Sequence, residues 1–266
     1  MLKYRIIDAH CHIYPDKIAE KASASTGRFY GIDMRFDGKV STLTELGNAS
    51  GIDHYIVQSV ATKPEQVVSI NNFIAEAVKQ SEGKMTGLGT LHPDSCDMKG
   101  DVEHLISLGL KGVKLHPDIQ GFKLDDYRCL KIYELCEGRL PVLLHTGDKR
   151  YDMSNPNRLA PILETYKDLT VIGAHFGGYS VWEDAKRMLP KYPNIYVDCS
   201  SSFFAMNDDE IMQAIDAFGV DRVLFGTDYP MWEPKTEIER LLSLKLSDED
   251  YEKIFHLNAE RLFGIK

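Results

Sequence analysis

Histidine, lysine and aspartate side chains stand at the ends of short apolar runs along this chain. His10 and His12 follow the first run, residues 4–9. If that run is a β-strand, side chains two positions apart point to the same face, so both imidazoles project to one point. Two neutral imidazoles aimed at one point suit a divalent transition metal. A His-x-His pair also arises on surfaces and in cores, so its meaning depends on further ligands at other strand ends.

Further polar side chains of this kind stand at later strand ends. Lys114 and His116 end the fourth apolar run, His145 the fifth, His175 the sixth and Asp228 the eighth. In a barrel of parallel strands the carboxyl ends meet at one face, where the active sites of such enzymes lie. With His92, whose place stays open, six of the nine histidines can face one cavity. We expect the other three to be solvated or core residues: His54, His104 and His256.

The elements that must position these groups alternate along the sequence. The eight strand-like runs are residues 4–9, 54–60, 85–91, 112–116, 141–145, 170–175, 194–199 and 222–228. Helical spacing of apolar residues lies between them, as in 69–81 and 126–137. Eight such units in 266 residues fit an α/β (β/α)₈ TIM barrel of roughly 250 residues better than an open sheet with a second domain. We therefore expect a single domain over residues 1–266.

The strand-end motifs resemble the amidohydrolase superfamily, in its amidohydrolase-related branch of metal-dependent TIM-barrel hydrolases and decarboxylases. They are IDAHCH at 7–12, GVKLHP at 112–117, PVLLHTG at 141–147, GAHFGG at 173–178, FGTDYP at 225–230 and NAERLF at 258–263. The resemblance spans the whole chain in the family's order. It is specific for the fold and the metal site and says little about the substrate.

The resemblance implies a mononuclear site with four ligands, His10, His12, His145 and Asp228, holding Zn²⁺ or another divalent ion such as Mn²⁺. His175 matches the histidine that orients or deprotonates water, or that polarises the substrate. Three imidazoles and one carboxylate leave an open position on the ion, as a catalytic site requires. Asp228 would also carry a proton to the leaving group.

Lys114 leaves the number of ions open. In binuclear members of the superfamily, a carboxylated lysine at the end of the fourth strand bridges two metals. In that arrangement His145 and His175 would bind the second ion. An unmodified Lys114 would instead anchor an anionic substrate, and this single-ion reading is favoured. His116 lies on the same face and is expected to touch substrate rather than metal.

The function expected first is a metal-dependent hydrolase in which activated water attacks a small lactone, amide or ester. The alternative is a lyase, either a non-oxidative decarboxylase or a hydratase of a small carboxylic acid. Decarboxylating relatives tend to be longer, and several have Glu at the position of His10, which favours hydrolysis. A nuclease fits the acidic chain poorly, and a non-catalytic barrel would not need His175 beside an open metal position.

Composition limits the partners. The formal net charge is -9, so we expect a small-molecule substrate and neither nucleic acid nor a membrane surface. We see no secretory signal and no long apolar run, and expect a cytoplasmic protein, with a homodimer as one possible assembly. The five scattered cysteines should be reduced. Cys11 should face away from the two histidines beside it.

Two further segments and six loop residues have features of their own. Residues 23–39 show no clear period and are expected to form a long loop that could cover the active face. Residues 247–263 open with a helix-start signal and should form a closing helix. Loop residues that could bind an organic acid, or simply pack, follow the ligand strands: Asp148, Arg150, Tyr179, Trp182, Tyr229 and Trp232.

Overall fold

Strands form at each of the eight predicted places in the computed structural model, which describes residues 3–266; Met1 and Leu2 of the predicted domain lie outside it. They are β1 (Ile7–His12), β2 (His54–Gln58), β3 (Met85–Gly87), β4 (Gly89–Thr90), β5 (Val113–Leu115), β6 (Val142–Leu144), β7 (Val171–Gly173), β8 (Ile195–Asp198) and β9 (Val223–Leu224). The third predicted strand is divided at Leu88 into β3 and β4. All pairings between these strands are parallel, as the alternating pattern predicted.

The strands close into a barrel. One sheet has the order β1-β2-β3 and the other β4-β5-β6-β7-β8-β9. The ends meet where the Ala9 and His12 N–H groups donate to the Phe225 and Tyr229 carbonyls, at 2.8 and 2.7 Å. Branched and small side chains fill the interior, including Ile7, Ala9, Ile56, Leu88, Leu143 and Ile172. The predicted (β/α)₈ barrel is therefore confirmed.

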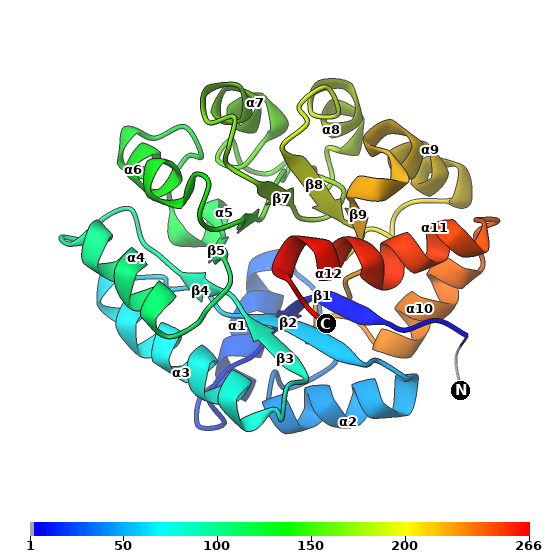
Figure 1. Ribbon diagram of the computed structural model, residues 1–266, viewed down its shortest axis with the longest axis horizontal. Coiled ribbons are helices and arrows are strands. Elements are labelled where there is room, and N and C mark those ends of the chain that lie inside the picture. The colour runs from blue at the N-terminus through cyan, green and yellow to red at the C-terminus, as the bar shows by residue number, and fades with distance from the viewer. Residues whose placement is uncertain (1–2) are drawn as a thin grey trace.

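Helices surround the strands, as Figure 1 shows. They are α1 (Ala19–Tyr30), α2 (Val40–Ser50), α3 (Val67–Gln80), α4 (Met98–Ser107), α5 (Pro117–Gln120), α6 (Tyr127–Cys136), α7 (Pro156–Thr165), α8 (Trp182–Met188), α9 (Asp208–Phe218), α10 (Pro234–Leu242), α11 (Asp248–Glu252) and α12 (Asn258–Phe263). The helices predicted over 69–81 and 126–137 are confirmed as α3 and α6. Short 3-10 turns occupy Pro64–Gln66 and Val220–Arg222, and a π-helical segment occupies Lys253–Leu257.

The C-terminal helices close one end of the barrel. Ser247 caps α11 by accepting a hydrogen bond from the Asp250 N–H, and Gly264 ends α12 in the left-handed conformation. Ala259 and Phe263 pack into the inner barrel core with Ile7. The predicted closing helix is therefore confirmed, and it covers the end opposite the carboxyl ends of the strands.

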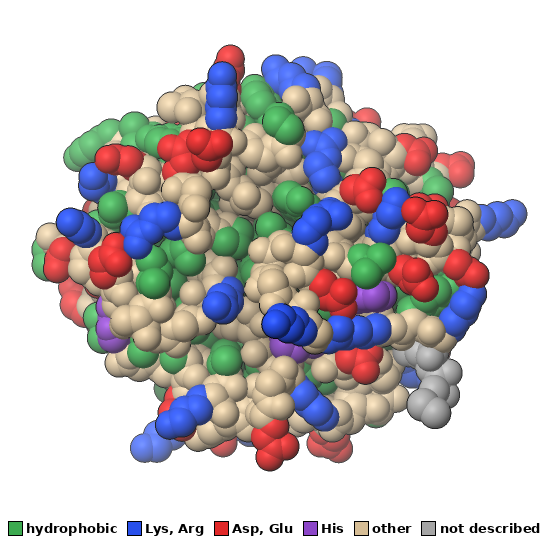
Figure 2. Space-filling view, in the orientation of Figure 1, with side chains coloured by type: hydrophobic (Ala, Val, Ile, Leu, Met, Phe, Trp, Pro, Cys, Tyr) green, Lys and Arg blue, Asp and Glu red, His purple; other side chains and the backbone are tan. Residues whose placement is uncertain are grey.

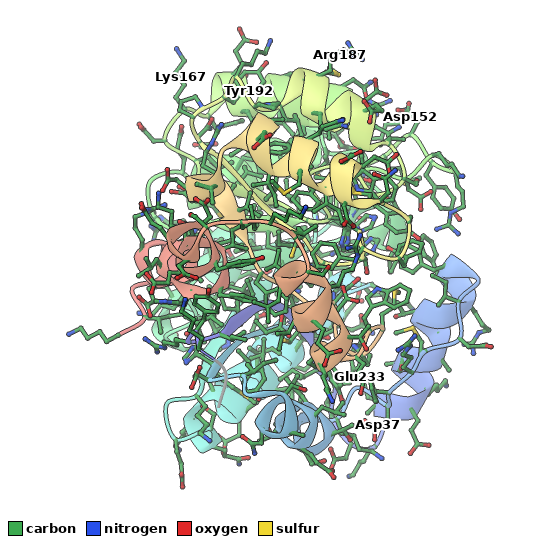
Figure 3. The ribbon with its side chains drawn as sticks, turned by 90° about the vertical axis from the view of Figure 1, so that its right-hand side faces the viewer. Asp37, Asp152, Lys167, Arg187, Tyr192 and Glu233 are labelled. Carbon is green, nitrogen blue, oxygen red and sulfur yellow. The ribbon has the colours of Figure 1, made fainter. Side chains whose placement is uncertain are left out.

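The prediction of a long loop over residues 23–39 is wrong for residues 23–30, because α1 continues to Tyr30. The buried face of α1 consists of small residues at every fourth position, Ala19, Ser23 and Gly27, which give no apolar periodicity. A Cβ at Gly27 would lie 2.5 Å from the Ile32 carbonyl oxygen, so a larger residue would push the helix away. Figure 3 shows α1 and α12 at opposite ends of the barrel, so α1 covers the face where the strands end.

Charges of both signs are interspersed on the face that carries α12, as Figure 2 shows. Among the described residues, no helix combines the length and apolar character that a membrane span requires.

Candidate functional site

A cavity of about 520 Å³ opens at the carboxyl ends of the strands. It brings together all seven residues that the sequence singled out: His10, His12, Lys114, His116, His145, His175 and Asp228. They come from five strand ends separated by up to 218 positions in the chain (228 minus 10). The barrel is what places them side by side.

His10, His12 and Asp228 converge most closely. The Nε2 atoms of the two histidines are 3.2 Å apart, and Asp228 Oδ1 lies 3.3 Å from the first and 3.5 Å from the second. Neutral imidazoles and a carboxylate are ligands that a divalent transition metal accepts. These three residues form the part of the predicted ligand set that the structure groups around one point.

A bulge in β1 sets the direction of the two imidazoles. The pairing with β2 shifts between Asp8 and Cys11, so β1 carries one residue more than its partner there. Cys11 points into the outer core and is fully buried, as predicted. The Asp8 carboxylate accepts hydrogen bonds from the Thr227 N–H and hydroxyl at 2.9 and 2.6 Å, which ties β1 to the turn that carries Asp228.

Hydrogen bonds on the far side of each ring determine the tautomers of His10 and His175. His10 Nδ1 lies 2.9 Å from Asp198 Oδ2, and His175 Nδ1 lies 2.9 Å from the Ser200 carbonyl oxygen. Carboxylate and carbonyl oxygens only accept, so both Nδ1 atoms carry the proton. Both Nε2 lone pairs therefore face the cavity, one available to a metal and the other to a proton.

His145 lies beside His175 rather than within the group of His10, His12 and Asp228. Its Nδ1 is 3.1 Å from His175 Nε2, and its other ring nitrogen faces Asp118 Oδ2 at 3.7 Å. His116, Asp118 and His145 form a second buried group of candidate ligands. Ligation by His145 stays a prediction, and in these positions it would require a shift of its ring toward His10.

Lys114 is buried at the centre of the site. Its Nζ lies 3.2 Å from His10 Nε2. Burial lowers the pKa of Lys114 to about 8, although the carboxylates of Asp228 and Asp198 oppose this change. A lysine with this pKa can exist both as the ammonium that attracts an anion and as the free amine that carboxylation requires.

The environment of the site favours the neutral form of three imidazoles and the ionised form of Asp228. Burial lowers the pKa of His12 and His145 well below the ordinary value, and that of His175 to about 4. For Asp228, burial raises the pKa, but His10, His175 and His12 outweigh that effect and the net pKa is lower than usual. A neutral imidazole can donate its lone pair to a metal, so this electrostatic state is ready to bind one.

Backbone strain coincides with the same residues. Asp228 has φ of 58° and His175 has φ of 60°, both in the left-handed region that disfavours residues with a Cβ. Strained backbone of this kind costs of order 1–3 kcal/mol per residue and clusters at functional sites. The backbone conformation that directs these two side chains into the cavity therefore lowers the stability of the folded protein.

Two functional candidates escaped the sequence analysis. Asp198 stands at the end of the predicted strand 194–199, so its position offered the same signal as the other strand-end residues. Tyr30 was hidden in the segment expected to be a loop. Its hydroxyl lies 2.6 Å from His116 Nε2. Since His116 Nδ1 accepts from the Ile119 N–H at 3.3 Å, Nε2 carries the proton and donates to Tyr30. The O–H of Tyr30 can then donate to His145, 3.4 Å away, or to a group in the cavity.

Other polar residues from the sequence analysis play supporting parts. Asp148 holds Arg150 at 2.6 Å, and the Arg150 guanidinium lies over the ring of Tyr30, 5.3 Å from its centre. Trp232 donates to the Ser201 hydroxyl, which donates to Asp228. The residues lining the cavity do not include the six loop residues named earlier, nor the four remaining histidines, His54, His92, His104 and His256.

The sequence of this chain matches a known protein family and one curated relative. The family model described as amidohydrolase matches residues 7–265. A curated relative, the gamma-resorcylate decarboxylase of Polaromonas sp. strain JS666, is 29% identical over 123 residues, which cover 39% of this chain and only 37% of the relative's length.

Two solved structures share the fold over nearly the whole chain. A dihydroxybenzoic acid decarboxylase from Polaromonas sp. JS666, solved with manganese and 2-nitroresorcinol, has a TM-score of 0.72 at 17% identity, covering 98% of this chain and 97% of that one. A candidate 2-pyrone-4,6-dicarboxylic acid hydrolase from Pseudomonas putida has a TM-score of 0.71 at 18% identity, with 100% and 99% covered. At these identities the likeness concerns the fold.

Proposed function

Because the chain belongs to the amidohydrolase family, we propose that it is a metal-dependent enzyme that removes CO₂ from a small carboxylic acid. The observation that carries the proposal is the group of His10, His12 and Asp228 with the Lys114 ammonium beside it. With an ion bound, this group would offer a carboxylate substrate a metal and a positive charge at the inner end of the cavity. The decarboxylase among the curated relatives supports the same reaction class.

The residues fit a resident divalent ion, Mn²⁺ or Zn²⁺, because Asp198 keeps the His10 Nε2 lone pair directed at the point where His12 and Asp228 also converge. His145 would complete the set. A bound ion would polarise a carboxylate or carbonyl group and lower the pKa of water. One ion per chain is proposed, with Lys114 unmodified and in contact with the substrate's anionic group.

The chain's own groups then supply orientation and proton transfer. When the bond to CO₂ breaks, its electron pair remains on the substrate carbon, which must take up a proton. His175 Nε2 and Asp228 are the titratable groups that face this point with lone pairs available to carry that proton. The Tyr30 hydroxyl and His116 line the same end and can bind a substrate oxygen.

Hydrolysis is the second candidate, favoured by the unprotonated His175 Nε2, which lies 3.1 Å from His145 Nδ1 and could take a proton from an attacking water. A fold neighbour is a candidate pyrone hydrolase. The sequence alone favoured this reaction. The cavity residues serve either reaction, so only turnover separates the two.

A substrate panel tests the proposal. Protein reconstituted with Mn²⁺ or Zn²⁺ would be incubated with hydroxybenzoic acids, other small carboxylic acids, lactones and amides, while CO₂ release and hydrolysis are followed separately. Metal-dependent CO₂ release is expected. Hydrolysis without CO₂ release would transfer the assignment to the second candidate, and turnover that is equal without metal would contradict both. Intact mass and metal content would show whether Lys114 is carboxylated with a second ion bound.

A further inference from the structure

The cavity extends beyond the metal-ligand end into an apolar trough between two helices. One wall is the face of α1 formed by Ile18, Ala22 and Phe29, and the other is formed by Val60, Ile70 and Phe73 at the β2 end and on α3. The spacings 18, 22, 29 and 70, 73 place each set on one helical face.

The α1 wall of the trough carries Ser25 and Thr26 beside its apolar residues, and the described protein leaves those apolar residues partly uncovered. The opposite face of α1 is buried, with the Ser23 hydroxyl donating to the Phe36 carbonyl at 2.7 Å. In contrast, Ile18 is 51% exposed, and Ala22 and Phe29 are half-buried. An apolar ligand in the trough would remove this surface from water.

Charge is confined to the other end of the cavity. Apart from histidines, the charged side chains that line it are Lys114 and Asp228, and both belong to the candidate metal centre. A second carboxylate on the substrate would enter the trough without a cationic partner, which is unfavourable in a buried site. A substrate of this cavity therefore carries one anionic group at the metal-ligand end and an uncharged body.

We infer that this trough, formed by Ile18, Ala22, Phe29, Val60, Ile70 and Phe73, is a subsite for a hydrophobic substituent, an alkyl chain or an aryl ring, on a monoanionic substrate. The inference rests on the proposed function for the position of the anionic group. The trough itself is a property of the two helices and can be tested apart from it.

The experiment measures binding of two ligand series to the purified protein by calorimetry. Linear alkanoates from acetate to octanoate are titrated into metal-loaded and into metal-free protein, and linear alkanols of the same lengths into metal-free protein. Each buried methylene should tighten binding about fourfold until the trough is full, in both series. If affinity does not change with alkyl chain length in either series, the proposed hydrophobic subsite is wrong.

The two series separate the two claims. Length-dependent binding of alkanols without any metal-dependent gain for alkanoates would support the trough and overturn the proposed function. Metal-dependent alkanoate binding without length dependence would support the proposed function and overturn the trough.

Matched variants locate the subsite. Ala22→Phe should fill the trough and weaken octanoate binding by roughly tenfold or more while acetate binding is unchanged, because several methylenes lose their space. Ala24→Phe, at an exposed position of the same helix outside the cavity lining, serves as the control. Ile70→Ala tests the opposite wall and should flatten the length dependence. Equal effects of Ala22→Phe and Ala24→Phe would refute the location.

Discussion

The Asp198→Asn variant tests whether Asp198 holds His10 in the tautomer that binds a metal. Asp198 is fully buried, and its two oxygens have separate partners. Oδ2 faces His10 Nδ1 at 2.9 Å, while Oδ1 accepts from the Ser200 N–H, the Ser200 hydroxyl and the His175 N–H at 3.0, 2.5 and 3.2 Å. Burial raises the pKa of Asp198, but His10 and Ser200 reverse this and hold it at about 2.

An asparagine cannot satisfy both sets of partners. If its NH₂ group replaces Oδ1, this donor faces the three groups that donate to Oδ1 in the wild type, and their hydrogen bonds are lost. If it replaces Oδ2, it donates to His10 Nδ1, so the proton of the neutral ring moves to Nε2 and the lone pair needed by the metal is lost. Replacing such an outer partner typically costs 10–100-fold in metal affinity, which corresponds to about 1.4–2.8 kcal/mol.

The assay is competition for Mn²⁺ or Zn²⁺ between the protein and a chromogenic chelator, which needs no knowledge of the substrate. Asp216→Asn, at an exposed position on α9, is the matched control and should bind metal as the wild type does. Circular dichroism of the metal-free proteins shows whether the variant is folded. A folded Asp198→Asn protein with unchanged metal affinity would refute the tautomer argument.

Three further predictions follow from the same geometry. His175→Asn should retain metal but lose about 10²–10⁴-fold in turnover, since the unprotonated Nε2 of His175 is the proposed proton acceptor. His104→Asn on α4 should match the wild type in steady-state rates, and full activity of the His175 variant would exclude a proton-transfer role. Tyr30→Phe removes a hydrogen-bonding group and should lower kcat/KM by an amount equivalent to about 1–3 kcal/mol, while metal affinity is unchanged. Weaker metal binding would instead indicate a structural role. Burial raises the pKa of Glu237 to about 8 from 4.5, so the folded state retains this proton longer than the unfolded state and the free energy of unfolding falls between these pH values, by about 3 kcal/mol at pH 7. Glu237→Gln should therefore be more stable than wild type by an amount that grows from pH 5 to pH 8 in denaturant titrations, and a difference independent of pH would contradict this.

Much of the fold was predictable because local patterns and the barrel agree. Each of the eight apolar runs became a strand, since a parallel barrel buries strands on both faces and so requires continuous apolar residues. Helix α1 was missed in the sequence analysis because its buried face shows no apolar pattern. Its buried positions, Ala19, Ser23 and Gly27, are small rather than periodic and apolar. At Gly27 the close approach of Ile32 and Met34 excludes a larger residue, and Ser23 donates to the Phe36 carbonyl.

The candidate site shows the same division. The sequence identified His10, His12, His145, His175 and Asp228, since each stands at a strand end and such ends meet in a barrel. It did not single out Asp198, because a strand-end carboxylate can bind a metal, bind substrate or orient another ligand. That choice depends on distance, and the 2.9 Å contact with His10 Nδ1 assigns Asp198 to orienting the imidazole.

The chain's residue order was enough to establish the barrel, its family and the set of polar groups on one face, because alternation of strands and helices and strand-end motifs are local properties. Three-dimensional packing alone determined which nitrogen of each histidine faces the cavity, that Tyr30 lies against His116, and that an apolar trough continues from the metal-ligand end. These features arise from contacts between residues far apart in the sequence, where a shift of an ångström separates a ligand from a neighbour.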